Sequence, residues 1–321
     1  KIKEVFEQGI TFLGKEHFLK ISIGIASTEN GAIKASELVG NADLAMYSAK
    51  KSGKNTCMYY DTVMTTQFIQ KKQIETELDK ACRNDGFTVL YQPQVDPSSG
   101  TTYCFEALVR LKNSPLSPGQ FIPVAEETDL ILSIGRIVTE KVIRQLALWK
   151  KGGLKLRPVS INFSSKQIRD REYVNYLNGL LKQYNISPNL IEIEITESIL
   201  LAHNAAAMKL FTDFAAIGIK LALDDFGTGY SSISYLTYMP VYKIKLDKSF
   251  IDTYLHDGKD AVIENIISLS HCLGLKITVE GIEEKRQCDR LKKFLCDYIQ
   301  GYYFSKPVTG EAIAQPGYIY K

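Results

Sequence analysis

From residue 87 onwards, short apolar runs alternate with segments whose apolar positions repeat at helical spacing, such as 261–273. We predict strands at 88–92, 104–110, 159–163, 190–195, 220–223, 242–246, 276–279 and 298–303. Repeated strand–helix units form a largely parallel sheet with right-handed crossovers. Eight such strands over this length predict an α/β fold of the (β/α)8 TIM-like barrel type.

The turn Asp96-Pro-Ser-Ser-Gly100 joins the first two predicted strands. A turn of this length and composition is typical of a hairpin, so we predict that the first strand is antiparallel. The preceding chain differs in pattern: 1–60 suggests a small separate unit, with strands at 18–26 and 56–60 and a helix before Gly53. Between them, 61–80 predicts a helical linker, and 81–321 is the barrel domain.

A partly apolar stripe runs along the predicted linker helix, formed by Met64, Phe68, Ile74 and Leu78. Such a stripe packs on a neighbouring domain or on a second copy of itself.

The composition and net charge limit the classes of function that this chain can have. The chain has 321 residues, 45% of them hydrophobic and 23% charged, with a formal net charge of +3. This balance gives no strong case for nucleic acid or an anionic membrane as a partner. No apolar stretch approaches the roughly 20 residues of a membrane span, so we expect a cytoplasmic protein. Because the chain starts at Lys1, an upstream segment that tethers it to the inner face of a membrane stays open.

The six cysteines show no Cys-x-x-Cys spacing and the four histidines no zinc-binding pattern. We therefore expect reduced thiols and no zinc site.

Two adjacent carboxylates, Asp224 and Asp225, follow the fifth predicted strand and precede Gly227 and Gly229. The glycines allow a sharp turn or a close approach to a ligand. Two unpaired carboxylates in a half-buried place repel each other, and a divalent cation removes that repulsion. A helix cap beside a turn aspartate is the alternative that this dipeptide leaves open.

Other polar residues also lie where predicted strands end, which is where the chemistry of such barrels is located. They are Glu106, Asn162, Glu194, Glu197, Asp224, Asp225, Lys245, Glu280 and Gln300. Oxygen ligands without histidine or cysteine favour Mg²⁺ or Mn²⁺. The number of acids suits two cations about 3.5–4 Å apart, an arrangement that serves phosphoryl-group hydrolysis. The alternative is that each acid is a separate cap or salt-bridge partner.

Seven motifs combine into a specific signature. They are Glu106-Ala-Leu-Val-Arg110, Ser160-Ile-Asn-Phe-Ser164, Glu194-Ile-Thr-Glu-Ser198, Asp224-Asp-Phe-Gly-Thr-Gly-Tyr-Ser-Ser232, Lys245-Leu-Asp-Lys-Ser-Phe250, Glu280-Gly-Ile-Glu283 and Gln300-Gly-Tyr-Tyr-Phe-Ser-Lys-Pro307. From about residue 70 the chain thus resembles an EAL domain, the cyclic di-GMP phosphodiesterase module.

Upstream, Ser22-Ile-Gly-Ile-Ala26 and Ala42-Asp-Leu-Ala-Met-Tyr-Ser-Ala-Lys-Lys-Ser-Gly-Lys-Asn55 resemble the C-terminal part of a GGDEF domain, the diguanylate cyclase module. This implies a partial α+β GGDEF remnant. The family's Gly-Gly-Asp-Glu-Phe turn is absent, so we do not expect cyclase activity.

The EAL resemblance implies two cation sites and a set of further roles. One site would use Glu106, Asn162, Glu194 and Asp224, and the other Asp224, Asp225 and Glu280. Lys245 would act beside the nucleophilic water, either helping to deprotonate it or stabilising developing charge, with Glu106 and Glu197 also among the catalytic groups. Glu197 would hold the loop after the fourth strand. Arg110 would grip a substrate phosphate, and Gln92, Leu108 and Gln300 would contact substrate.

The implied reaction is hydrolysis of one phosphodiester of cyclic di-GMP to linear pGpG, supported by two Mg²⁺ or Mn²⁺ ions and inhibited by Ca²⁺. The resemblance and the linker stripe also imply a homodimer through the EAL domain. Three alternatives stay open: a receptor that binds cyclic di-GMP without cleaving it, a scaffolding module that needs neither ligand nor metal, and a hydrolase for a related phosphodiester.

The chain departs from the family pattern at three positions. Leu111 stands where tryptophan is usual, Asp129 where glycine is usual, and Val279 where alanine is common. None of them is an implied metal ligand. We therefore expect them to affect rate more than the type of reaction.

Overall fold

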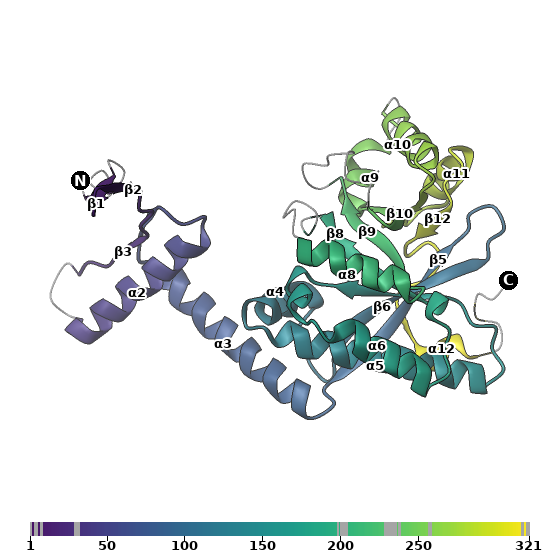
Figure 1. The fold of residues 1–321 in the computed structure, drawn as a ribbon, viewed down its shortest axis with the longest axis horizontal. Helices are drawn as coiled ribbons and strands as arrows, with labels where there is room; N and C mark the ends of the chain where they lie inside the picture. Colours follow the sequence, from purple (N-terminus) through teal and green to yellow (C-terminus); the bar gives the residue numbers. More distant parts are fainter. Residues whose placement is uncertain are drawn as a thin grey trace. The chain divides into compact units, whose positions relative to one another are not determined.

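A computed structural model describes residues 2, 6, 9–28, 33–197, 199, 205–227, 236, 239–255, 259–315 and 318 of the chain (Figure 1). The chain divides into two compact units, Lys1–Glu77 and Leu78–Lys321. No helix among the described residues is long and apolar enough to cross a membrane. All six cysteines carry free thiols, as expected.

The N-terminal unit contains two small sheets and one long helix. Strands β1 (Ile10–Phe12) and β2 (Lys15–His17) form an antiparallel pair. Strands β3 (Ile23–Ile25) and β4 (Cys57–Tyr59) pair in parallel, and helix α2 (Ala35–Lys51) connects them. The unit is therefore of α+β type, as the sequence predicts.

The contact between β3 and α2 explains the glycine in the first upstream motif. A Cβ atom at Gly24 would lie 2.0 Å from the backbone oxygen of Ala42, so the helix packs directly on the strand backbone. The predicted strand at 18–26 is too long, because only its central residues pair with β4. Gly53 follows the end of α2 with a φ of +104°, a conformation that glycine adopts without steric cost.

Helix α3 (Thr62–Arg83) corresponds to the predicted linker. Within the N-terminal unit its side chains Val63, Phe68 and Ile69 are 54%, 38% and 49% exposed, whereas Leu78 is fully buried. Of the predicted apolar stripe, Phe68 is thus exposed, Met64 and Ile74 are half-buried and Leu78 is buried, whereas Val63 and Ile69 lie outside that stripe.

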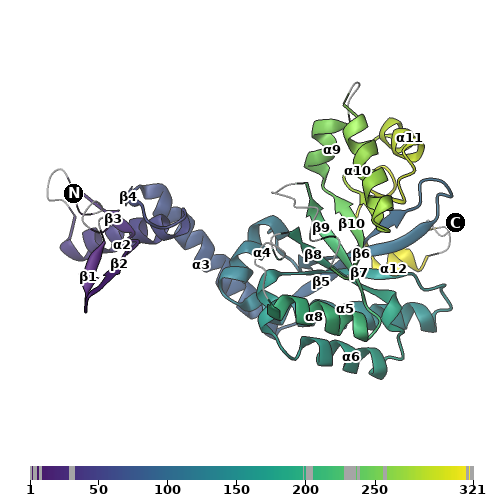
Figure 2. The same ribbon diagram turned by 45° about the horizontal axis from the view of Figure 1, so that its top comes forward.

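Eight strands close into a barrel in the C-terminal unit (Figures 1 and 2). They are β5 (Phe87–Val95), β6 (Thr102–Leu111), β7 (Val159–Phe163), β8 (Ile191–Thr196), β9 (Lys220–Phe226), β10 (Val241–Leu246), β11 (Lys276–Val279) and β12 (Tyr298–Gln300). Strand β5 runs antiparallel to β6 and to β12, which completes the barrel, and the other neighbours are parallel. This confirms the predicted barrel with one antiparallel strand.

Helices cover the outside of the barrel. They are α4 (Pro118–Glu127), α5 (Leu130–Lys151), α6 (Tyr173–Gln183), α8 (Ala205–Ala216), α9 (Lys248–Tyr254), α10 (Ala261–Cys272), α11 (Lys285–Lys293) and α12 (Gly310–Ile313), with short 3-10 turns η1 (Ser165–Arg169) and η2 (Pro188–Leu190). Helices α5, α6 and α8 lie along one part of the wall and α9, α10 and α11 along another (Figure 2).

Several strand predictions differ from the structure. Strand β5 continues to Val95, three residues beyond its predicted end. Strand β9 continues to Phe226, three residues beyond its predicted end, so Asp224 and Asp225 belong to the strand. Strand β12 ends at Gln300, where the chain turns, and not at 303. A short strand that we did not predict, β13 (Val308–Thr309), pairs antiparallel with β5 beside the closed barrel.

Trp149, on helix α5, packs against the barrel wall. It is 2% exposed, and its ring centroid lies 5.1 Å from that of Tyr91 and 5.8 Å from that of Phe105. Its indole Nε1 donates a 2.9 Å hydrogen bond to the backbone oxygen of Gly310, at the start of α12. One side chain therefore joins two helices to strands β5 and β6.

We expect Trp149→Ala to lower the free energy of unfolding of the barrel unit by about 3–5 kcal/mol, because it removes a large buried ring and leaves a cavity. Urea unfolding followed by circular dichroism measures this change. The neighbouring Leu148 is 61% exposed, so Leu148→Ala should change the value by no more than about 0.5 kcal/mol. Equal effects of the two substitutions would contradict this account of the core.

Candidate metal centre

A single lysine lies among four carboxylates inside the barrel, near the carboxyl ends of the strands. Lys245 Nζ, on β10, is 2.8 Å from Glu194 Oε2, 3.1 Å from Asp224 Oδ1, 2.7 Å from Glu280 Oε1 and 3.5 Å from Glu106 Oε2. The lysine is 1% exposed and the glutamates of β6 and β8 are 6% and 1% exposed. Five charged groups from five strands or strand ends thus share one water-poor space.

Amide side chains hold the carboxylate of Glu106. Asn162 Nδ2 donates to its Oε1 at 2.8 Å, and Gln300 Nε2 donates to its Oε2 at 2.6 Å. Gln300 also donates to Gln92 Oε1 at 3.2 Å. The structure therefore brings together four residues that the sequence placed in two groups, metal ligands and substrate contacts.

One ammonium cannot neutralise four carboxylates, of which three are buried and Glu280 is half-buried. Burial raises the pKa of Glu106, but the charge of Lys245 and the hydrogen bonds from the amides outweigh it and hold that pKa below its usual range. Burial and repulsion from the other acids raise the pKa of Glu194 to about 8 and that of Glu280 well above its usual range. The charge of Lys245 lowers both pKa values but does not outweigh these effects. The pKa of Lys245 is itself raised, since the surrounding acids outweigh its burial.

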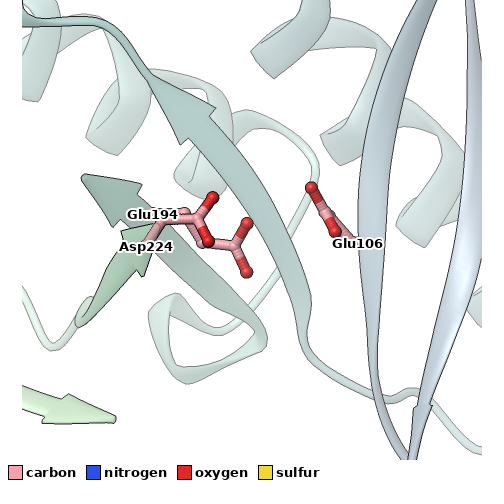
Figure 3. A group of neighbouring side chains, drawn as sticks. All are labelled: Glu106, Glu194 and Asp224. Carbon is pink, nitrogen blue, oxygen red and sulfur yellow. The ribbon is translucent and has the colours of Figure 1, made fainter. Parts of the chain in front are cut away.

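The donor set fits divalent cations. Glu106, Glu194 and Asp224 each offer a carboxylate oxygen, and these oxygens lie within 4.8 Å of one another. Figure 3 shows Glu194 and Asp224 side by side, with Glu106 facing them. Glu280 Oε1 is buried and accepts no hydrogen bond among the described residues, although it lies close to the ammonium. Oxygen ligands with surplus negative charge suit Mg²⁺ or Mn²⁺.

The two adjacent aspartates diverge, as side chains of one strand do. Asp224 is 8% exposed and faces the acids, whereas Asp225 is exposed and adopts a φ of +56°. Its backbone N–H donates to Asp224 Oδ1 at 3.0 Å. Partial burial and repulsion from Asp224 raise the pKa of Asp225 to about 6. Asp225 is therefore near the group of acids but not among the three whose oxygens converge.

The backbone turns immediately after these aspartates. Gly227 has a φ of +96°, and a Cβ atom there would lie 2.7 Å from the ring of Phe250, so both conformation and space require glycine. The second predicted glycine, Gly229, lies outside the described residues, with the rest of its motif to Ser232. Glu197 is 4% exposed directly after β8. Most of the loop that it is predicted to hold, 198 and 200–204, also lies outside the described residues.

Two hollows adjoin the acids. One has a volume of about 380 Å³ and is mainly apolar, with Leu108, Arg110, Asn162 and Glu194 in its wall. The other, of about 320 Å³, has several polar and charged residues in its wall and is lined by Gln92, Lys248, Glu280, Gly281, Glu283, Gln300, Gly301 and Tyr302. All four residues predicted to contact substrate therefore line a hollow. Lys248, Glu283 and Tyr302 also line one, although the motif analysis gave them no role.

A second charged layer lies deeper in the barrel, on the same strands. Lys243 Nζ is 2.6 Å from Glu192 Oε2, and both side chains are fully buried. Burial opposes the charged forms, but mutual attraction outweighs it: the pKa of Glu192 is lowered and that of Lys243 is raised. This layer pairs one acid with one base and needs no cation. The sequence analysis missed it, although Glu192 and Lys243 lie two residues before Glu194 and Lys245.

The comparisons with known proteins follow this geometry. A family model described as EAL domain matches residues 75–307, and one described as diguanylate cyclase, GGDEF domain, matches residues 3–56. The chain is 34% identical over 319 residues to the signaling protein YkoW of Bacillus subtilis, covering 98% of this chain and 40% of that protein.

Two further relatives have informative names. The chain is 33% identical to the bifunctional diguanylate cyclase/cyclic di-GMP phosphodiesterase MucR of Pseudomonas aeruginosa, covering 92% of this chain and 44% of that protein. It is 33% identical to PaMucR phosphodiesterase in its c-di-GMP complex, with a TM-score of 0.70, covering 75% of this chain and 99% of that structure. The chain thus spans less than half the length of these curated relatives.

The raised pKa of Glu194 predicts how stability depends on pH. Its folded pKa of about 8 lies above the ordinary value of 4.5, so the folded protein holds a proton that the unfolded chain releases. The corresponding stability is present below pH 4.5 and is lost as the pH rises through about 8. With a chelator present to remove divalent cations, we expect the melting temperature to fall as the pH rises from 4.5 to about 8. Glu194→Gln should make this decrease smaller.

Added Mn²⁺ should restore the melting temperature of the unsubstituted protein at pH 8, because a cation replaces the proton. Differential scanning calorimetry at several pH values measures both effects. Glu140, exposed on the outside of α5, provides a matched control, and Glu140→Gln should leave the pH profile unchanged. Parallel profiles for the unsubstituted protein and Glu194→Gln would contradict the assignment.

Proposed function

The chain belongs to the EAL domain family, and on that basis we propose that it hydrolyses cyclic di-GMP to linear pGpG with the help of Mg²⁺ or Mn²⁺. One observation carries the proposal: four carboxylates, three of them buried and Glu280 half-buried, share a single ammonium at the carboxyl ends of the strands. Such a surplus of negative charge is stable only with protons or cations present. The names of the relatives, which include cyclic di-GMP phosphodiesterase, support the substrate.

The residues that would hold the cations are those the resemblance implies. The first site would use Glu106, Asn162, Glu194 and Asp224, and the second Asp224, Asp225 and Glu280. Bound cations would polarise the phosphodiester and lower the pKa of an attacking water molecule. The exposed position of Asp225 suits a ligand that approaches from the open side of the centre.

Lys245 and Arg110 would act on the phosphate itself. A lysine that is protonated among acids can only donate hydrogen bonds, so it stabilises negative charge that develops on the phosphate oxygens. Removal of a proton from the attacking water is the second role that the resemblance implies for Lys245. Arg110 borders the apolar hollow, where its planar guanidinium would bind a phosphate with two hydrogen bonds.

The two hollows support a substrate with two bases. Cyclic di-GMP carries a guanine on each side of its phosphate-containing ring. One base in the apolar hollow and the other base in the second hollow would bring a phosphodiester to Glu106, Glu194 and Asp224, since both hollows include residues of the acidic centre. A mononucleotide would fill only one of them.

The alternative is a receptor that binds cyclic di-GMP without cleaving it. The departures from the family pattern are the observation in its favour. Asp129 has a φ of +58° at the start of α5, which explains why glycine is usual there, and Ile131 two residues later lines the apolar hollow. Leu111 is 6% exposed in β6 and Val279 is fully buried in β11, so both affect packing and not the ligand oxygens. Turnover separates this alternative from the hydrolase.

The domain organisation remains part of the proposal: 1–60 as a partial GGDEF domain, 61–80 as linker and 81–321 as the EAL domain. The cytoplasmic location, the lack of a nucleic-acid partner and the inhibition by Ca²⁺ also stay predictions.

We expect purified protein to convert cyclic di-GMP to pGpG in Mg²⁺ or Mn²⁺, with product lost on chelation and suppressed by Ca²⁺. Glu106→Ala should lower kcat/KM more than about 100-fold. Loss of a residue that only hydrogen-bonds a metal ligand lowers metal affinity or activity about 10–100-fold, and loss of the ligand itself should have a larger effect. Chromatography of the products measures both results. The matched control Glu140→Ala removes an exposed carboxylate from α5 and should leave the rate unchanged.

Tight binding of cyclic di-GMP with no product in either metal would overturn the hydrolase and establish the receptor. If cyclic di-GMP still bound after alanine had replaced every proposed cation ligand, the result would instead contradict the metal centre.

We also propose that two copies associate through the EAL domain. The exposed apolar side chains Val63, Phe68 and Ile69 on α3 support a contribution from the linker helix. Sedimentation across a concentration series should give twice the 36.1 kDa mass of one chain. A mass of one chain at every concentration would refute the dimer.

A further inference from the structure

Gln94 links the candidate metal centre to the ion pair beneath it. This side chain, on β5, is fully buried in the barrel interior. Its Nε2 donates to Glu194 Oε1 at 3.4 Å, and its Oε1 accepts a hydrogen bond from Lys243 Nζ at 2.8 Å. The two ends of one amide therefore contact two charged groups in different layers.

Lys243 determines which way the amide points. An ammonium has three donors and no acceptor, so only the amide oxygen can face it. The amide nitrogen is then left facing Glu194. In the reversed orientation the oxygen would lie against the Glu194 carboxylate and the NH₂ group against the ammonium, which gives two repulsive contacts in place of two attractive ones.

Lys243 is itself held firmly. Glu192 Oε2 lies 2.6 Å from its Nζ, and Tyr103 donates a 3.3 Å hydrogen bond to Glu192 Oε1. The ammonium also lies 5.8 Å from the ring centroid of Tyr103 and 5.6 Å from that of Tyr242, within the range of cation–π attraction. The orientation of Gln94 is therefore fixed from below by groups that lie outside the centre.

We propose that Gln94 and Lys243 are positioning residues that orient the Glu194 carboxylate for cation binding. Gln94 holds Oε1 of Glu194, and Oε2 is thereby turned toward Lys245 and the other acids, at 2.8 Å from the ammonium. Hydrogen bonds to the far side of a metal ligand fix its orientation, and their loss weakens metal affinity about 10–100-fold. This inference rests on the proposed function, because it needs a cation at Glu194.

The alternative is that the deeper layer only fills the barrel. Buried ion pairs contribute little net stability compared with well-packed apolar residues. The interior of such barrels is usually filled by branched apolar side chains. Filling alone therefore gives no reason for Glu192, Lys243 and Gln94 to be charged or polar, whereas orienting a ligand does.

The test is calorimetric titration of the full chain with Mn²⁺ in the absence of substrate. Gln94→Met keeps the volume and removes the donor to Glu194, so the dissociation constant for Mn²⁺ should rise about 10-fold or more. At saturating Mn²⁺, kcat should recover while KM for the substrate stays unchanged. Leu177→Met is the matched control, because Leu177 is also fully buried but lies on α6, and its substitution leaves the donor to Glu194 in place.

A second variant guards against misfolding of the first. Glu192→Met with Lys243→Met removes the ion pair as a unit, so no unpaired charge stays buried. Without Lys243 the amide loses its fixed orientation, and the dissociation constant should rise in the same direction. A dissociation constant equal to that of the unsubstituted protein, in either folded variant, overturns the inference.

The result also distinguishes this inference from the proposed function. An unsubstituted chain that binds no Mn²⁺ overturns the metal centre, and the positioning role with it. An unsubstituted chain that binds Mn²⁺ and cleaves cyclic di-GMP, with Gln94→Met behaving identically, overturns only the role of Gln94 and Lys243.

Discussion

The structure of the candidate site depends on one electrostatic constraint, a single buried ammonium among four carboxylates. Removing charged groups from water is unfavourable unless opposite charge compensates them. Lys245 cannot compensate all of them, and without cations Glu194 and Glu280 hold protons more readily, as their raised pKa values indicate. A cluster with this imbalance suits divalent cations, which is the basis of the proposed phosphodiester chemistry.

The two charged layers of the barrel differ in their balance of positive and negative charge. Strands β8 and β10 contribute an acid and a lysine to each layer, since residues two apart face the same side of a strand. The deeper layer is complete as the pair Glu192 and Lys243, whereas the upper layer gains further acids from β6, β9 and the end of β11. The proposed cation site is therefore the layer that carries surplus negative charge, and the presence of acids alone does not distinguish it from the deeper layer.

Much of the barrel and the site follows from local patterns in the sequence. Apolar runs give the strands, the Asp96–Gly100 turn gives the antiparallel β5, and the closure of parallel strands brings their carboxyl ends together. The end of β9 does not follow, because it depends on the backbone conformation of Asp225. The short length of β3 is also missed, because pairing with β4 and not alternation of side chains decides which residues form the strand.

The deeper layer was missed for a different reason. A charged residue in a strand pattern usually faces solvent. Lys243 faces inward only because Glu192 and Gln94, from distant parts of the chain, are there to meet it. Asp129 is similar: the sequence shows a departure from glycine, but only the φ of +58° explains why glycine is usual. The pattern of apolar and polar residues shows neither which distant residues meet in the fold nor which backbone conformation a residue adopts.

The most direct test of the metal centre is anomalous diffraction from crystals grown with Mn²⁺ and cyclic di-GMP. We predict anomalous peaks beside the carboxylates of Glu106, Glu194 and Asp224, with a phosphodiester against them and Lys245 Nζ shifted away from the acids toward the phosphate. Crystals with bound nucleotide but no anomalous peak, and with Lys245 still paired to all four acids, would contradict the account.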